Sequence, residues 1–230
     1  LVKLSMVGDV MIGGILSSEI EQYKNIFLSN EVRKYLSADI TFGNLECPLT
    51  MEGSPPTEDK ILLHARDNSI ELLKKAGFNV VSLANNHIMD FGYDAALKTM
   101  KLLEENDIRY TGVGRNLRDA RKPVFFDKND FKIAFFAYVA PETWGGWNQR
   151  KHQTHKGWFA TTDKPGVAPF NLKFIKEDIE RVKEESDFLV ISVHWGEERT
   201  RFPHPEIVSD AHKIVDMGAN LVVGHHPHLL

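Results

Sequence analysis

Short apolar runs alternate along this chain with longer segments in which polar and apolar residues are mixed. Runs of this kind, each closed by glycine, proline or polar residues, are typical of buried β-strands. We predict strands over residues 2–7, 39–45, 80–84, 108–111, 123–126, 131–139, 188–193 and 220–223. The intervening polar-faced segments predict helices over residues 19–27, 31–36, 66–76, 93–106, 172–186 and 205–217. Strands that alternate with helices indicate a layered α/β protein with a largely parallel sheet.

One long segment, residues 140–170, contains no predicted helix or strand and holds Trp144, Trp147 and Trp158. A loop of this length inside a compact protein is usually functional or mobile. Its tryptophans either cover a substrate or pack as a lid over the core. Residues 112–116 contain a Gly-x-Gly without a third glycine or a following lysine, which indicates a turn and not a nucleotide-binding loop.

Side chains that can bind metal follow the ends of several predicted strands. They are Asp9, Glu46, Asn86, His87, His194, His226 and His228. Because parallel strands deliver their carboxyl ends to one edge of a sheet, we expect these side chains to converge in a single pocket. On an extended segment, residues two apart point to the same side, so His226 and His228 are predicted to face one way. The alternatives are that Asp9 caps a turn and that the histidines form a surface loop.

The residue types in this set favour a divalent metal. Aspartate, glutamate, asparagine and histidine without cysteine suit Mn²⁺, Zn²⁺ or Fe²⁺, and the set is large enough for one or two ions. A two-metal site activates water and stabilises both oxygens of an in-line displacement. His87 could then protonate the leaving group. Asp90 either caps the helix predicted over 93–106 or orients the ring of His87.

Composition narrows the class of protein. The chain has 230 residues, 42% of them hydrophobic, which is enough for one large α/β domain or two small ones. A net charge of −4 argues against a nucleic-acid-binding protein. The single Cys47 rules out an internal disulfide and leaves the compartment open. No apolar run is long enough to cross a membrane and no signal peptide is visible. We expect the chain to be a fragment, truncated at its C-terminus, with any anchor outside it.

An ordered series of motifs resembles the CapA family, which comprises bacterial capsule proteins associated with poly-γ-glutamate synthesis. The motifs are Gly8-Asp9-Val10-Met11, Asn44-Leu45-Glu46-Cys47-Pro48, Ala84-Asn85-Asn86-His87, His194-Trp195-Gly196 and Gly224-His225-His226-Pro227-His228. This family resembles the calcineurin-like metallophosphoesterases. The resemblance therefore implies a single domain over residues 1–230, built as a four-layer αββα sandwich of two sheets flanked by helices.

The resemblance also implies roles for individual residues. Met11 stands where the phosphoesterase pattern has a histidine, and His225 receives no role. The implied metal ligands are Asp9, Glu46, Asn86, His194, His226 and His228, and the implied catalytic residues are His87 and Asp90. The expected substrate-binding residues are Asn44, Asn85, Arg199 and Arg201, within a basic fringe that also includes Arg66, Arg150 and Lys151. Each of these basic residues could equally be an ordinary solvated charge.

Two functions from different classes follow. The first is a metal-dependent hydrolase or transferase acting on a phosphate-containing substrate or an amide-type bond of an anionic polymer. The second is a non-catalytic accessory protein that binds the nascent polymer or a membrane synthase complex. A nucleotide or nucleic-acid phosphodiesterase is a third possibility, which the negative charge disfavours. The resemblance implies a bacterial protein outside the cytoplasm, held at the membrane by a segment absent here, with a cytoplasmic location as the alternative.

Overall fold

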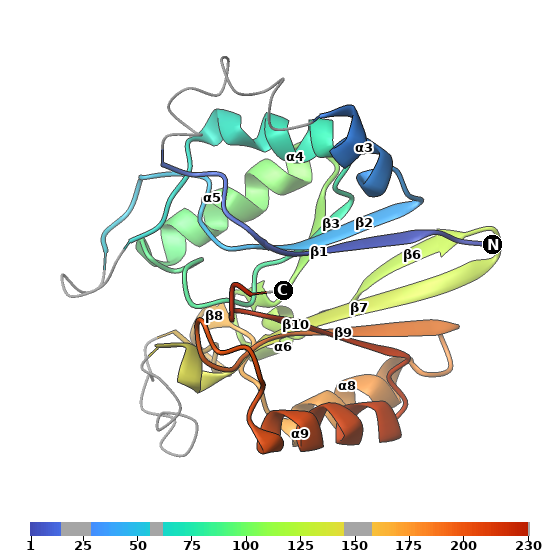
Figure 1. The fold of residues 1–230 in the computed structure, drawn as a ribbon. Coiled ribbons are helices and arrows are strands. Elements are labelled where there is room, and N and C mark those ends of the chain that lie inside the picture. Colours follow the sequence, from blue (N-terminus) through green and yellow to red (C-terminus); the bar gives the residue numbers. More distant parts are fainter. Residues whose placement is uncertain (15–28, 56–61, 145–157, 230) are drawn as a thin grey trace. The chain divides into compact units, whose positions relative to one another are not determined.

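A computed structural model describes residues 1–14, 29–55, 62–144 and 158–229 (Figure 1). The helix predicted over residues 19–27 and the side chains of Trp147, Arg150 and Lys151 lie outside these ranges. The chain divides into two compact units. One unit comprises residues 3–110, and the other comprises residues 111–230 together with residues 1–2.

The unit of residues 3–110 is built on a four-stranded sheet whose strands follow one another in chain order. The first three strands run parallel. The strands are β1 (Leu4–Val10), β2 (Ile40–Leu45), β3 (Val80–Ser82) and β4 (Arg109–Thr111). Every residue of β2 is buried, as an apolar run of this kind predicts. The pairing of β1 with β2 shifts register between Met6 and Asp9. Because the strand resumes after this irregularity, Asp9 lies within β1 and not beyond its end.

In the described parts of this unit, three α-helices accompany the sheet (Figure 1). They are α3 (Asn30–Leu36), α4 (Ile70–Ala76), which a 3₁₀ turn η1 (Asp67–Ser69) precedes, and α5 (Gly92–Glu105). The Ser29 hydroxyl accepts the Val32 N–H at 3.3 Å and begins α3. Gly77 ends α4 in the left-handed conformation, with φ of 80°. These three helices lie where the hydrophobic periodicity predicts them, with ends shifted by a few residues.

The unit of residues 111–230 is built on a second four-stranded sheet, ordered β10-β9-β7-β6. Its strands are β6 (Val124–Lys128), β7 (Phe131–Val139), β9 (Phe188–His194) and β10 (Leu221–His225). β7, β9 and β10 run parallel, whereas β6 pairs with β7 as an antiparallel hairpin. The hairpin turns at Asn129 and Asp130, both with positive φ, which is the conformation that tight hairpins require.

Two long helices pack on one face of this second sheet (Figure 1). They are α8 (Leu172–Val182) and α9 (Pro205–Asp216). The Asn171 side chain accepts the N–H groups of Lys173 and Phe174 and begins α8. The apolar side chains between the sheet and the helices form a core that includes Phe136, Tyr138, Ile191, Ile175, Ile179 and Ile214. Alternate residues on the other face of β7 are also buried, as in a parallel sheet's central strand.

Shorter elements complete this unit. They are β5 (Val113–Gly114), which pairs with β8 (Gly166–Val167), the helix α6 (Leu117–Ala120) and the 3₁₀ turn η2 (Pro141–Trp144). The prediction that residues 112–116 form only a turn is therefore wrong for Val113 and Gly114. A two-residue strand whose partner lies about fifty positions away leaves no periodicity to detect.

The predicted α/β class is confirmed, with two largely parallel sheets in place of the one that periodicity alone suggests. Each unit supplies one sheet and its own helices, which are the layers that an αββα sandwich requires. The assignment of all 230 residues to a single domain stays a prediction. Within the described ranges, no helix is long and apolar enough to cross a bilayer.

Candidate metal centre

Three oxygen-bearing side chains stand at the strand ends of the unit of residues 3–110. Asp9 lies in β1, Glu46 follows β2 directly, and Asn86 follows β3 after a few residues. The Glu46 N–H donates to the Val10 carbonyl at 3.1 Å, which continues the pairing of β1 with β2 past the last residue of β2. Glu46 and Asn86 are almost fully buried, whereas Asp9 is half-buried. Parallel pairing thus brings these side chains to one edge of the sheet.

Two asparagines hold this edge together. The Asn44 amide donates to Asp9 Oδ1 at 2.7 Å, and Asn85 donates to Asn44 Oδ1 at 3.1 Å and to the Leu45 carbonyl at 2.8 Å. Asn85 Oδ1 also accepts the N–H groups of His87 and Ile88 at 3.0 and 2.8 Å. A side-chain amide has two donor hydrogens and one acceptor oxygen, so the whole amide of Asn85 is used inside the protein.

This hydrogen bonding changes the role expected for Asn85, whose amide has no donor left for a substrate and whose oxygen already accepts two hydrogen bonds. Because it is fully buried and fixes the backbone around His87, it is better described as a positioning residue. Asn44 is equally buried and orients the Asp9 carboxylate. The expectation that these two asparagines bind substrate stays untested.

His87 and Asp90 form a buried pair. His87 Nδ1 lies 2.7 Å from Asp90 Oδ2, and the same carboxylate oxygen accepts the Leu63 N–H at 2.8 Å. Asp90 is completely buried, and α5 begins at Gly92 after the N-cap residue Phe91, without any side-chain cap. Of the two roles open to Asp90, the geometry therefore supports orienting the imidazole over capping the helix. A carboxylate at Nδ1 places the proton there and leaves Nε2 available for chemistry.

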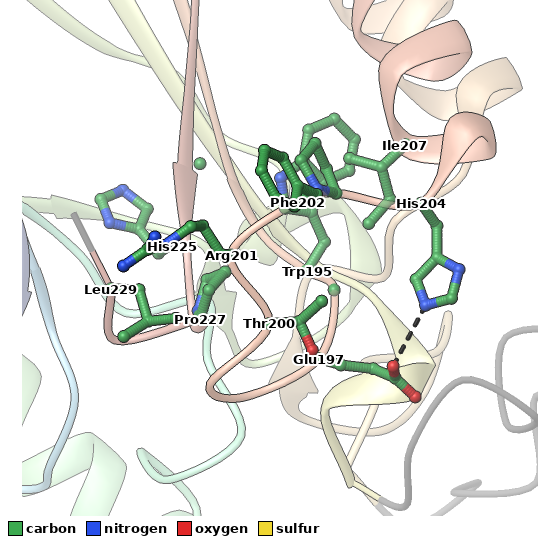
Figure 2. A pocket seen from close by; sticks show the side chains of 13 residues that line it. Trp195, Glu197, Thr200, Arg201, Phe202, His204, Ile207, His225, Pro227 and Leu229 are labelled. Atoms are coloured by element: carbon green, nitrogen blue, oxygen red, sulfur yellow. Dashed lines mark hydrogen bonds and ion pairs between the residues drawn. The ribbon is translucent and has the colours of Figure 1, made fainter.

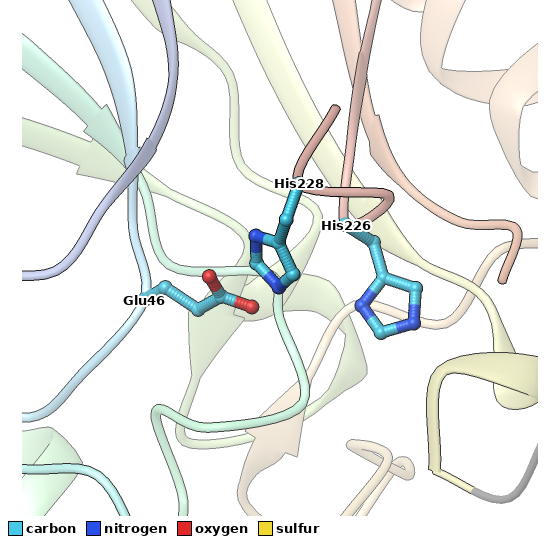
Figure 3. A group of neighbouring side chains, drawn as sticks. All are labelled: Glu46, His226 and His228. Atoms are coloured by element: carbon cyan, nitrogen blue, oxygen red, sulfur yellow. The ribbon is translucent and has the colours of Figure 1, made fainter. Parts of the chain in front are cut away.

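Three histidines gather in the unit of residues 111–230. His194 is the last residue of β9 and is fully buried, and it pairs across the sheet with His225, the last residue of β10. The rings of His194 and His226 lie 4.7 Å apart between centroids, and those of His226 and His228 lie 6.0 Å apart. The two later histidines follow β10, whereas Glu46 follows β2 of the other unit (Figure 3).

The extended geometry predicted for His226 and His228 is wrong. β10 ends at His225, and His226 and His228 have φ of 99° and 54°, so neither continues an extended strand. The chain instead turns around Pro227, and the turn brings the two rings together. Residues other than glycine rarely adopt positive φ, and such conformations are concentrated at functional sites.

A buried carboxylate that the sequence did not reveal lies in the same unit. Glu142 belongs to η2, the turn that follows β7, and only 1% of its surface is exposed. Its Oε1 accepts the Gly196 N–H at 3.3 Å, two residues beyond His194. It follows a buried strand as the other candidates do. The pattern was missed because Glu142 opens the long segment 140–170, where no element was predicted.

A pocket of about 240 Å³ is lined by residues that fall within 195–229 (Figure 2). Arg201 lines this pocket, whereas Arg199 does not. The Arg199 backbone N–H donates instead to the Pro227 carbonyl at 2.8 Å. Trp144 packs edge-on against Phe159, with ring centroids 5.2 Å apart, so this tryptophan contributes to packing.

The donor chemistry of both units fits a divalent metal. Carboxylate oxygens, an amide oxygen and imidazole nitrogens are the ligands of borderline and hard divalent ions, and both units contain candidate ligands of this kind. Cys47, which follows Glu46, is fully buried and belongs to neither group of candidate ligands among the described residues. Burial raises the pKa of its thiol from 9.0 to about 12.

A comparison with protein families places this sequence among bacterial capsule synthesis proteins. The family described as "Bacterial capsule synthesis protein PGA_cap" matches residues 3–230. The chain belongs to this family, and the predicted resemblance to CapA is confirmed.

Curated relatives agree with this assignment. The chain is 31% identical over 235 residues to the "Capsule biosynthesis protein CapA" of Bacillus anthracis, covering 99% of this chain and 54% of that protein. It is 30% identical over 229 residues to the "PGA biosynthesis protein CapA" of Bacillus subtilis, covering 98% of this chain and 57% of that protein. A "Probable polyglutamine synthesis accessory protein" of Mycobacterium tuberculosis is 27% identical over 199 residues, covering 84% and 50%. The chain thus spans about half the length of these relatives.

Among solved structures, the crystal structure of TT1561 of Thermus thermophilus aligns over 97% of this chain and 81% of that one. The identity is 9% and the TM-score is 0.47, a similarity too distant to support an argument about fold or function.

Proposed function

We propose that this chain acts in the biosynthesis of an anionic bacterial capsule polymer of the poly-γ-glutamate type, as a metal-dependent hydrolase or transferase. The family and the names of the relatives support the process. The buried pair of His87 and Asp90, with Nδ1 and Oδ2 2.7 Å apart, supports the chemistry, because a carboxylate at Nδ1 fixes the tautomer and orientation that a proton-transferring imidazole needs. The bond acted on is a phosphate ester or an amide-type bond of the polymer.

The proposed metal ligands carry over from the sequence. They are Asp9, Glu46, Asn86, His194, His226 and His228, for one or two ions of Mn²⁺, Zn²⁺ or Fe²⁺. Support comes from each unit by itself: one collects oxygen donors at the ends of β1 and β2, and the other collects three neighbouring imidazoles. A divalent ion, when bound, supplies Lewis acidity toward a phosphoryl or carbonyl oxygen and makes water more acidic.

The protein's own residues then handle the proton. Asp90 accepts the Nδ1 hydrogen of His87 and so fixes both the tautomer and the orientation of the ring. His87 Nε2, when protonated, donates a proton to the oxygen or nitrogen that leaves. Asn85 fixes the backbone on which His87 stands.

The experiment compares metal content and phosphate-ester hydrolysis in the native chain and three variants. We expect His194→Ala to lose bound metal and turnover together. His87→Gln is expected to keep its metal and to lose about 10²–10⁴-fold in turnover on phenyl phosphate, whose leaving group needs a proton. The loss on p-nitrophenyl phosphate should be much smaller, because that leaving group is a stronger acid. His212→Ala, on the exposed face of α9, is the matched control and should leave both quantities unchanged.

If the native protein binds no divalent metal and hydrolysis does not depend on His194, the catalytic proposal is wrong. A metal that remains tightly bound in His194→Ala would contradict the ligand set alone.

One observation favours a second function, a non-catalytic accessory protein that binds the polymer or a synthase complex. Met11 stands where the phosphoesterase pattern has a histidine, and its Sδ accepts the Gly13 N–H at 3.1 Å. This position therefore offers a thioether engaged with the backbone and not an imidazole. One relative is itself named a probable accessory protein. Binding of the polymer without His194-dependent turnover would support this second function.

The proposed process also suggests a place in the cell. We propose that the protein works outside the cytoplasm beside a membrane synthase, attached by a segment outside this chain. The test is protease treatment of intact and lysed cells that express the full-length gene. Degradation in intact cells supports an external location, and protection until lysis contradicts it.

A further inference from the structure

The pocket of Figure 2 has one apolar side and one basic side. It is formed entirely by the loop between β9 and α9, the start of α9 and the end of β10, all within residues 195–229. Trp195, Phe202 and Pro227 give it aromatic and apolar walls, and Arg201 stands among them. Its volume of about 240 Å³ lies below the range of pockets that enclose drug-sized ligands. It can therefore hold one small group and not a whole oligomer.

Arg201 is the group with which this pocket can bind an anion. Glu197, the acidic residue among those that line it, is paired with His204, whose Nε2 lies 3.1 Å from the carboxylate (Figure 2). Arg201, in contrast, has no hydrogen bond or ion pair with any residue in the described parts of the chain. Its guanidinium is exposed and presents a planar set of donors suited to a carboxylate or a phosphate.

The loop that carries Arg201 is held in place at two points. The Trp195 N–H donates to the His225 carbonyl at 3.2 Å, and the Arg199 N–H donates to the Pro227 carbonyl at 2.8 Å. Gly196 and Arg199 adopt the left-handed conformation, with φ of 92° and 57°. A pocket whose walls are fixed in advance loses less entropy when a ligand binds.

The pocket also adjoins the candidate metal centre of its own unit. His225 lines it, is 2% exposed, and precedes the proposed ligand His226. His225 also pairs with His194 across β9 and β10. A ligand seated in the pocket would therefore contact His225, the residue before the proposed ligand His226, which gives His225 a role that the sequence did not assign.

We propose that this pocket binds one carboxylate-bearing residue of an acidic polymer, with Arg201 on the carboxylate and Trp195 and Phe202 against its methylene groups. The proposal rests on the proposed function, since the acidic polymer comes from there. A glutamate residue has methylene groups that can pack against the aromatic side chains and a carboxylate that can bind the guanidinium. Inorganic phosphate has no apolar part and can use only the guanidinium.

The test is isothermal titration of the 230-residue chain with a γ-linked glutamate oligomer, with free glutamate and inorganic phosphate as separate titrants. We expect the oligomer to bind more tightly than either small titrant. Arg201→Gln should weaken oligomer binding by about 10–100-fold, as expected for the loss of a charged hydrogen-bonding partner. Phe202→Ala, at a side chain that is 78% exposed and so dispensable for folding, should weaken it less.

Arg115→Gln is the control, because Arg115 is exposed in the same unit, carries the same charge, and does not line the pocket. Its affinity for the oligomer should stay close to that of the native chain. Equal losses in Arg115→Gln and Arg201→Gln would overturn the proposal, because they would indicate attraction by net charge alone. Arg201-dependent binding of phosphate as tight as that of the oligomer would also overturn it.

The phenyl phosphate assay separates this proposal from the proposed function. Arg201→Gln should lose oligomer affinity while its metal content stays that of the native chain. If neither the native chain nor any variant hydrolyses phosphate esters but Arg201→Gln still weakens oligomer binding, the catalytic proposal is wrong and the proposed role of the pocket is supported.

Discussion

At the scale of single residues, the chemistry of the unit of residues 3–110 is organised by buried amides and one buried carboxylate. Asn44 orients Asp9, Asn85 fixes the backbone of His87, and Asp90 orients the His87 ring. In each contact, a supporting residue holds a residue with a proposed chemical role. The supporting residue forms hydrogen bonds inside the protein and is not itself proposed to bind metal. Such supporting contacts commonly change metal affinity or activity by about 10–100-fold when they are lost.

Asp90→Asn tests the support of His87. The amide can still hydrogen-bond to Nδ1, but it lacks the charge that fixes the tautomer and stabilises a protonated ring. We expect metal content to persist and turnover on phenyl phosphate to fall by about 10–100-fold. Steady-state kinetics beside metal analysis give both numbers. Asp94→Asn, at an exposed position in the first turn of α5, is the control, and an equal effect there would contradict the role given to Asp90.

Some of the candidate site residues could be predicted from the sequence, and others could not. Asp9, Glu46 and His194 could be proposed because they directly follow apolar runs. The sequence could not show that the hydrogen-bonding groups of the Asn85 side chain are all used inside the protein, because two of its partners lie some forty residues away. Glu142 was missed because η2 has no pattern of its own.

At the scale of elements, α8 is joined to the sheet by a buried polar network as well as by apolar packing. Asp178 of α8 is fully buried and accepts the Tyr138 hydroxyl of β7 at 2.7 Å. The same carboxylate pairs with Arg121 at 2.7 Å and with Arg181 at 2.8 Å. Two guanidinium groups and one hydroxyl thus compensate the buried charge, which would otherwise be costly.

This network predicts how stability depends on alkaline pH. Burial, and next the negative charge of Asp178, raise the pKa of Tyr138 well above 10.0. In the unfolded chain the same phenol ionises near its ordinary pKa of about 10. The unfolded state therefore binds fewer protons above that pH, and the free energy of unfolding must fall as pH rises through and beyond about 10. Urea unfolding at a series of pH values on either side of that pKa measures this fall.

Tyr138→Phe supplies the comparison for that experiment. The variant should be less stable near neutral pH, because Asp178 loses a buried donor, by about 1–3 kcal/mol. Above a pH of about 10 its stability should decline less steeply than that of the native chain. Identical slopes in the two proteins would show that Tyr138 ionises normally when folded.

Hydrophobic periodicity predicted the presence of helices and strands better than it predicted the residues at which they end. β6 and β7 form the predicted hairpin, and α9 ends one residue before its predicted end. α8 stops at Val182, short of the predicted residue 186. The strand over residues 113–114 was not predicted, because its pairing with residues 166–167 is set by tertiary contacts.

At the scale of the whole molecule, the sequence did not show which strands share a sheet. The chain passes from one unit to the next between Tyr110 and Thr111, within β4 and without a polar or proline-rich linker. Alternating elements alone favoured one parallel sheet, and only the resemblance to a known family implied two. The strand pairings that decide the matter are long-range and leave no local pattern.

Metal binding should be visible in the stability of the whole chain. At an ion concentration about a hundred times the Kd, binding to the folded state adds about 2.7 kcal/mol, which corresponds to a rise in Tm of about 5–11 °C for a chain of this size. We expect a chelator to reverse this rise and both Glu46→Gln and His226→Ala to abolish it. The double variant Glu206→Gln, His212→Ala on exposed positions of α9 should keep it. Retention of the full rise in either ligand variant would remove that residue from the site.

The division of the chain at Tyr110 also bears on the order in which the two units can fold during synthesis. Domains form from the N-terminus as the ribosome releases them, so residues 3–110 can collapse while later residues are still being joined. On the proposed ligand set, the early portion carries only carboxylate and amide oxygens, a combination suited to magnesium or calcium. The imidazoles that favour manganese, zinc or iron belong to the unit that is translated later. On this ligand set, the donors that distinguish these ions from magnesium or calcium become available only after residues of the second unit have been made.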